Sequence, residues 1–79
     1  MDIIKFEIQV RSKLKQLSDL SPQIAYTNIN KKDQLLITYT DKIPDIETTE
    51  KMFKALKIFG SVETNHCLEV NYIAFIITK

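Results

Sequence analysis

The chain has very little of the residues on which cross-links and phosphate-binding loops depend: its 79 residues include one cysteine and one glycine. The single cysteine, Cys67, cannot form a disulfide within the chain, so a reducing compartment is expected. The single glycine, Gly60, leaves no glycine-rich loop to cradle a phosphate. The chain has no run of about 18 apolar residues, which argues against a membrane span. With no secretory-signal pattern at the N-terminus either, we expect a cytoplasmic protein.

Neither sign of charge is in large excess. Eleven basic and ten acidic residues give a net charge of +1, which argues against a strongly electrostatic binder of nucleic acid. Among the basic residues Arg11 is the only arginine, and this lysine bias is typical of an AT-rich genome. The composition, 44% hydrophobic and 27% charged, is that of a globular domain. We expect one domain, residues 1–79, with a core so thin that assembly often supplements it.

The most β-prone stretch is residues 72–78, where six of seven side chains are β-branched or aromatic. Neither of its alternating faces is polar, one consisting of Tyr72, Ala74 and Ile76 and the other of Ile73, Phe75 and Ile77. A strand with one face in water alternates apolar with polar residues, so this strand is predicted to be central and covered on both sides. One helical layer covers only one side.

Residues 2–20 are compatible with two structures. As a helix, capped by Asp2 and ended by residues 18–22, they carry an apolar stripe of Ile3, Phe6, Val10, Leu14 and Leu17. As a strand, Ile4, Phe6, Ile8 and Val10 alternate with polar residues. The strand would leave only about ten residues for a following helix. We therefore favour the helix, on which Ile4 and Ile8 form a second apolar strip.

Two hairpins and a second helix are predicted further on. Residues 24–29 and 35–40 flank the polar turn 30–34, and residues 61–67 and 72–78 form a second hairpin, with one long strand from His66 as the alternative. Between the hairpins, Asp45 is suited to cap a helix that runs to Phe59. Its apolar face consists of Met52, Phe53, Ala55, Leu56 and Phe59. Gly60 is expected to end it in the left-handed conformation.

These elements predict an α+β fold of two αββ units, αββαββ, with a four-stranded antiparallel sheet and two helices on one face. A shift of about 37 residues places Thr27 and Asn28 on Thr64 and Asn65, which favours this pseudo-symmetric order. If residues 3–10 were a strand instead, the order would be the ferredoxin-like βαββαβ, of which αββαββ is a circular permutation. The similarity is one of layout only.

Residues with catalytic or ligating chemistry are few. His66 and Cys67 are adjacent, but neighbouring side chains of a strand point to opposite faces, and one histidine with one cysteine falls short of a metal site. The carboxylates Asp41, Asp45, Glu47 and Glu50 are accounted for by helix capping and solvation. We therefore expect neither an enzyme nor a bound metal or cofactor.

Basic residues and tyrosines indicate a nucleic-acid-binding module as the alternative function. The basic candidates are Lys5, Arg11, Lys13 and Lys15 on the first segment and Lys31 and Lys32 at the hairpin tip. Tyr26, Tyr39 and Tyr72 lie on strands and would make a stacking platform if the register placed them on one face, as in several folds that bind single strands.

The apolar excess favours a different function. Ile4 and Ile8 on the first helix, and Tyr72, Ala74 and Ile76 on the last strand, exceed what one thin core needs and are the candidate protein interface. The leading hypothesis is a non-enzymatic protein-interaction module that forms a homodimer and acts in a cytoplasm. Small size and AT-rich coding suit an inhibitor from a phage or mobile element that blocks a host protein.

Overall fold

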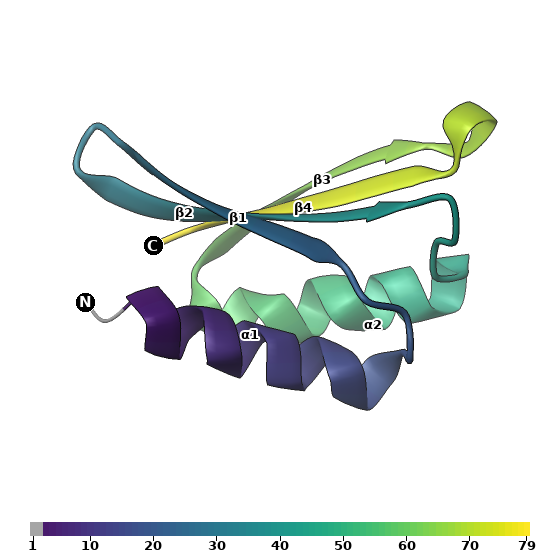
Figure 1. The fold of residues 1–79 in the computed structure, drawn as a ribbon, viewed down its shortest axis with the longest axis horizontal. Helices are drawn as coiled ribbons and strands as arrows, with labels where there is room; N and C mark the ends of the chain where they lie inside the picture. The colour runs from purple at the N-terminus through teal and green to yellow at the C-terminus, as the bar shows by residue number, and fades with distance from the viewer. Residues whose placement is uncertain (1–2) are drawn as a thin grey trace.

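The computed structural model describes residues 3–79, which form one sheet with two helices on one side of it (Figure 1). The elements in chain order are α1 (Ile3–Leu17), β1 (Gln23–Ile29), β2 (Lys32–Thr40), α2 (Ile46–Leu56), η1 (Lys57–Phe59), β3 (Ser61–Cys67), η2 (Leu68–Val70) and β4 (Tyr72–Thr78), the two η elements being single 3-10 turns. This arrangement confirms the predicted αββαββ order with two helices and a four-stranded antiparallel sheet. The alternatives, a strand at residues 3–10 and one long strand from His66, are wrong.

The first segment is a helix because that conformation buries one apolar stripe against the core and leaves the other residues exposed to solvent. Phe6, Val10 and Leu14 are buried, whereas Ile4 and Ile8 are 68% and 60% exposed. A strand would instead have placed Ile4 and Ile8 on the same face as Phe6 and Val10. The helix ends where the Ser18 N–H donates to the Leu14 carbonyl oxygen at 3.0 Å. The predicted cap Asp2 lies outside the described residues.

The strand order in the sheet is β1-β2-β4-β3, with every neighbouring pair antiparallel. This is the order that the ferredoxin-like arrangement takes when its first strand is moved to the end of the chain. β4 is central, as predicted, because it pairs with β2 on one side and β3 on the other. β1 and β3 are the edge strands.

The turn of the first hairpin is shorter than predicted. β2 begins at Lys32, so residues 32–34 of the expected turn belong to the strand. Only Asn30 and Lys31 connect the strands, and both have positive φ, 54° and 65°. Two such residues in succession form the type I′ turn, whose twist matches that of the flanking strands. The pairing of Ile29 with Lys32 follows directly from this turn.

α2 is capped as its sequence predicts. The Asp45 carboxylate accepts a hydrogen bond from the Thr48 N–H at 2.7 Å, and this hydrogen bond lowers the pKa of Asp45. Met52 and Leu56 are fully buried, and Phe53 and Phe59 are partly buried beside them. The regular helix stops at Leu56, and η1 continues the chain to Phe59.

Gly60 is required for a reason other than the predicted left-handed cap. Its φ of 156° and ψ of −161° lie in an extended region that is essentially restricted to glycine. A Cβ at this position would also overlap the carbonyl oxygen of Thr78 on β4. Gly60 thus allows the backbone entering β3 to pass close to the end of β4.

The core lies between the helices and the facing side of the sheet. Ile73, Phe75 and Ile77 of β4 are fully buried there, together with Leu35, Ile37 and Tyr39 of β2 and the buried residues of both helices. On the other side of β4, Tyr72 and Ile76 are only partly buried. Within residues 3–79 β4 is therefore covered on one side only, because both helices lie on that side (Figure 1); cover of the other side by a second chain stays a prediction.

Candidate protein-interaction surfaces

The side of the sheet that faces away from the helices is here named the open face. Its residues alternate along each strand with those that face the helices, and cross-strand partners share a face. The register assigns to the open face Gln23, Ala25, Thr27, Ile29, Lys32, Gln34, Leu36, Thr38, Thr40, Ser61, Glu63, Asn65, Cys67, Tyr72, Ala74, Ile76 and Thr78.

Charge is nearly absent from the open face. Only Lys32 and Glu63 are charged, and they are of opposite sign. Lys32 stands beside the hairpin turn, and Glu63 lies on the edge strand, where it is opposite Ile76. The centre is apolar, with Leu36 directly opposite Ile76. An apolar centre within an uncharged polar surround and a charged rim is the layout of a protein interface.

The five predicted interface residues lie on two surfaces. Tyr72, Ala74 and Ile76 are on the open face, whereas Ile4 and Ile8 project from α1 on the helical side of the molecule. Ala74 is fully buried even on the open face. Other open-face residues, such as Leu36 and Thr38, were not predicted. Their alternation was visible in the sequence, but only the register with β4 shows that they belong to the same surface.

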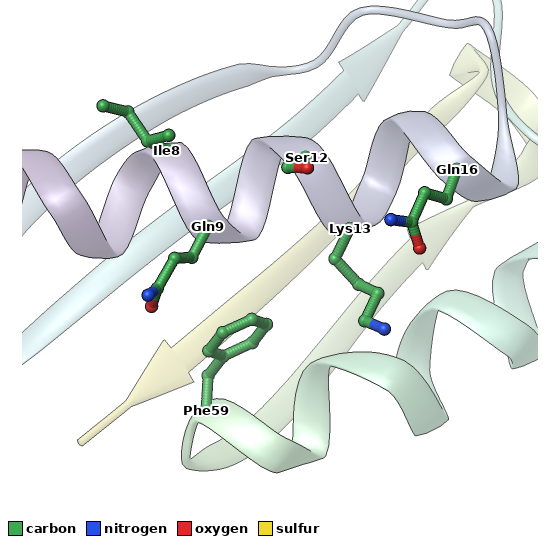
Figure 2. A pocket seen from close by; sticks show the side chains of 6 residues that line it. All are labelled: Ile8, Gln9, Ser12, Lys13, Gln16 and Phe59. Carbon is green, nitrogen blue, oxygen red and sulfur yellow. The ribbon is translucent and has the colours of Figure 1, made fainter.

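A hollow of about 450 Å³ lies between α1 and η1, lined by Ile8, Gln9, Ser12, Lys13, Gln16 and Phe59. Figure 2 shows the Phe59 ring directed toward α1, with Gln9 and Lys13 extending toward it and Ile8 projecting from the other side of the helix. Four of the six lining side chains are polar, and Lys13 is the only charged one.

The three tyrosines do not share one face, so the register does not meet the condition for a stacking platform. Tyr26 and Tyr39 lie on the helix-facing side of the sheet, and Tyr72 lies on the open face. Tyr39 is only 1% exposed, and its burial raises its pKa to about 12. Its hydroxyl has no hydrogen-bond partner in the part of the chain that the structure describes. A ring so enclosed cannot stack on a base.

Tyr26 is exposed but bonded to an acidic residue. Its hydroxyl donates to Asp33 Oδ1 at 2.6 Å, and Asn28 Nδ2 donates to the same oxygen at 2.9 Å. The hydrogen bond between the two side chains raises the pKa of Tyr26 and lowers that of Asp33. Asp33 lies on the helix-facing side of the sheet, whereas its neighbour Lys32 lies on the open face.

The basic candidates come from two elements, with Lys5, Arg11, Lys13 and Lys15 on α1 and Lys31 and Lys32 at the β1–β2 turn. Arg11 lies 3.5 Å from Glu7 one turn earlier, an exposed ion pair. Lys13 is half-buried in the hollow beside Phe59. The structure thus divides these residues between two elements instead of collecting them around the tyrosines.

His66 and Cys67 point to opposite sides of β3, as predicted. His66 is opposite Ile73, on the helix-facing side, and Cys67 is opposite Tyr72, on the open face. Both side chains are exposed. Among the four carboxylates before and within α2, Asp45 caps the helix and Glu47 lies 3.5 Å from Lys51. Residues 3–79 contain no group of three or more His, Cys, Asp or Glu side chains placed to hold a metal ion.

Comparisons of the chain with protein-family models, with curated proteins and with solved structures find no match. None of the helices in the described part of the chain has the length and apolar character to cross a membrane.

Proposed function

We propose that this chain is a small non-catalytic protein-interaction module that pairs with a second copy of itself through the open face. The observation that carries the proposal is the near absence of charge on this face. Charged residues make up 27% of the chain, yet the open face has two. Water-exposed sheet faces normally carry polar and charged residues at alternate positions.

The size of the face predicts the strength of the dimer. Four strands about 4.8 Å apart and seven residues long at about 3.3 Å per residue cover roughly 450 Å² per copy. Two copies then bury on the order of 900 Å², below the ~1,200–2,000 Å² of stable complexes and within the range of weak ones. Two sheets packed face to face lie about 10 Å apart with their strands within about 30°. We expect a concentration-dependent dimer with a helical layer on each outer side.

The wider role that we propose is inhibition: the module occupies a functional surface of a host protein in the host cytoplasm. This role suits the small size and lysine-biased composition of a chain encoded by a phage or mobile element. Affinity purification from a host lysate identifies a stoichiometric partner, and the partner's own assay then tests inhibition. A partner whose activity is unchanged by a saturating amount of this chain contradicts the role.

Light scattering on a sizing column, from micromolar to millimolar concentration, tests the self-association. The wild type should shift from monomer to dimer, and Leu36→Lys, which places a charge at the centre of the open face, should stay monomeric. Ile8→Lys makes the same change on exposed α1 and should dimerise like the wild type. If Ile8→Lys abolishes the dimer and Leu36→Lys does not, the interface is the α1 strip. A monomer at every concentration refutes self-association.

The native cysteine provides an independent measurement. Cys67 is exposed on the open face, so dimerisation should slow its alkylation as the protein concentration rises. A Cys67→Ser, Lys54→Cys variant carries the thiol on α2 instead, and its alkylation rate should not depend on concentration. Equal behaviour of the two thiols would contradict coverage of the open face.

A further inference from the structure

The hollow between α1 and η1 has the size of a small-ligand site. Its volume of about 450 Å³ lies within the range of about 300–1,000 Å³ that is typical of pockets for small molecules. It opens on the helical side of the molecule, away from the open face of the sheet. A ligand bound there would leave the proposed dimer interface uncovered.

Phe59 supplies the aromatic surface of this hollow. Phe6 packs against it at a tilt of 55°, with the two ring centroids 5.9 Å apart, and this contact ties the ring to the core. Phe59 is nevertheless only partly buried, and the rest of its ring lines the hollow. An aromatic ring held in this way is a surface on which a planar heterocycle can stack.

Polar side chains of α1 surround the ring. Figure 2 shows the Phe59 ring between the ends of the Gln9 and Lys13 side chains, with Gln16 further along the helix. Gln9 and Lys13 are four residues apart, which is about 6 Å along the helix axis. The side chains of Gln9, Lys13 and Gln16 make no hydrogen bond or ion pair with another described residue. Their polar groups therefore remain available to a ligand.

The charge of the lining favours an anionic ligand. Lys13 is the only charged residue of the lining, so no carboxylate opposes an anion there. Glu7, the one acidic residue of α1, lies 3.5 Å from Arg11 and does not line the hollow. Lys13 is partly buried, and salt screens a partly buried charge less than an exposed one. Lysine is a common partner of phosphate groups.

The Gln9 amide favours one kind of heterocycle. The amide has a donor and an acceptor side by side, which match the N6–H₂ donor and the N7 acceptor of adenine. Guanine presents two acceptors, O6 and N7, at the same edge, so the amide cannot make both hydrogen bonds with it. A base stacked on Phe59 can direct this edge to Gln9 and its phosphate to Lys13, because these two side chains flank the ring (Figure 2).

From these observations we infer that the hollow between α1 and η1 binds an adenine nucleotide. Phe59 stacks on the base, Gln9 binds its edge and Lys13 pairs with the phosphate. A free mononucleotide and an unpaired adenylate of a single strand present the same chemistry. The site goes beyond the self-association proposed above and does not depend on it.

The probe is AMP, titrated into the wild type while the backbone amide resonances are recorded. The resonances that shift should cluster at residues 9–16 and at Phe59. Adenosine lacks the phosphate and ribose 5-phosphate lacks the base, so each should bind at least tenfold more weakly than AMP, and GMP at least fivefold more weakly. No saturable shift with AMP, shifts on another surface, or equal binding of any of these three compounds would overturn the inference.

A short oligoadenylate separates the two sources of the ligand. If it binds more tightly than AMP at the same residues, the site belongs to a nucleic-acid strand, and its affinity should fall steeply with salt. If it binds no more tightly than AMP, the site belongs to a free nucleotide. Both results retain the adenine nucleotide as the ligand.

Two phenylalanines provide a matched pair on the protein. Phe53 and Phe59 are both partly buried against the same core, but only Phe59 lines the hollow. Phe59→Leu should weaken AMP at least tenfold and Phe53→Leu by less than threefold, with urea unfolding used to confirm that both variants are folded. Equal losses in two folded variants would overturn the inference.

A second pair leaves the core intact. Lys13→Gln should weaken AMP at least fivefold without changing the affinity for adenosine, because only the phosphate contact is lost. Lys15→Gln removes the same charge from a residue outside the hollow and should change neither affinity. Equal losses of AMP affinity would show that only overall charge matters and would refute the site. Leu36→Lys, which tests the dimer, should leave AMP binding unchanged, so the two proposals fail separately.

Discussion

Replacing Tyr39 with phenylalanine should stabilise the protein. The Tyr39 side chain is 1% exposed, and its hydroxyl has no hydrogen-bond partner in residues 3–79. A buried polar group without a partner costs about 1–3 kcal/mol, because it loses its hydrogen bonds to water. Tyr39→Phe removes that group and keeps the ring among its neighbours. We expect the free energy of unfolding in urea at neutral pH to rise by about 1 kcal/mol, a large step for a small domain.

The same residue predicts a dependence on alkaline pH. The pKa of Tyr39 rises from 10.0 to about 12 in the folded protein because the phenol is buried. Below pH 10 the Tyr39 hydroxyl is protonated in both the folded and the unfolded chain, so its ionisation does not change the free energy of unfolding. As the pH rises toward 12 the free energy of unfolding falls, because the unfolded chain releases the proton first. At about 1.36 kcal/mol per pKa unit, the loss approaches roughly 2.7 kcal/mol. Tyr39→Phe lacks this group, so its advantage over the wild type should grow across that window.

Urea titrations of both proteins at several pH values give the difference directly, and groups common to both proteins cancel. Tyr72→Phe serves as the control. Tyr72 is only partly buried, so removal of its hydroxyl should change the free energy of unfolding little. A Tyr39→Phe variant that is less stable by 1 kcal/mol or more would show that the hydroxyl is satisfied. A difference that stays constant from neutral to alkaline pH would refute the burial argument as well.

The remaining predictions concern α2 and the residue that follows it. Gly60→Ala should lower the free energy of unfolding by about 1–3 kcal/mol from backbone strain alone, with a further cost from the overlap with Thr78, measured in urea. Leu56→Ala should cost about 2–5 kcal/mol because Leu56 is fully buried, whereas Lys54→Ala should be near neutral by the same measurement. Asp45→Ala should lower the thermal midpoint at neutral pH, because the carboxylate caps α2. The capping contribution is present above pH 3.8 and is lost as the pH falls through the lowered pKa of Asp45, so melting curves of variant and wild type should converge there.

The order of the elements could be predicted from the sequence because local signals and burial agree. The carboxylate of Asp45 marks the start of α2, and the doubly apolar pattern of residues 72–78 marks a central strand. The ambiguity at residues 3–10 was resolved by chain length, since a strand there leaves too few residues for a useful helix. These are properties of short segments and need no partner.

The surfaces could not be predicted, because they depend on how segments meet. Two residues of positive φ, Asn30 and Lys31, determine the register of the first hairpin, and with it the side on which Tyr26 lies. The reason for Gly60 is likewise non-local, since the atom that excludes a Cβ belongs to Thr78. The hollow beside Phe59 combines residues of α1 and η1. No pattern within one segment indicates any of these.

The central place of β4 has a consequence for folding. Within the described chain both hairpins form from neighbouring residues, but the only strand pairing between them is that of β2 with β4, in which Leu36 meets Ile76. The segment that connects β2 to β4 must close into a loop, and this closure costs entropy before any contact between the hairpins compensates for it. During synthesis, the first hairpin and both helices leave the ribosome before their central partner does. The edge of β2 that pairs with β4 is therefore the last to receive its partner, and in that interval a chaperone or a second nascent copy has access to it.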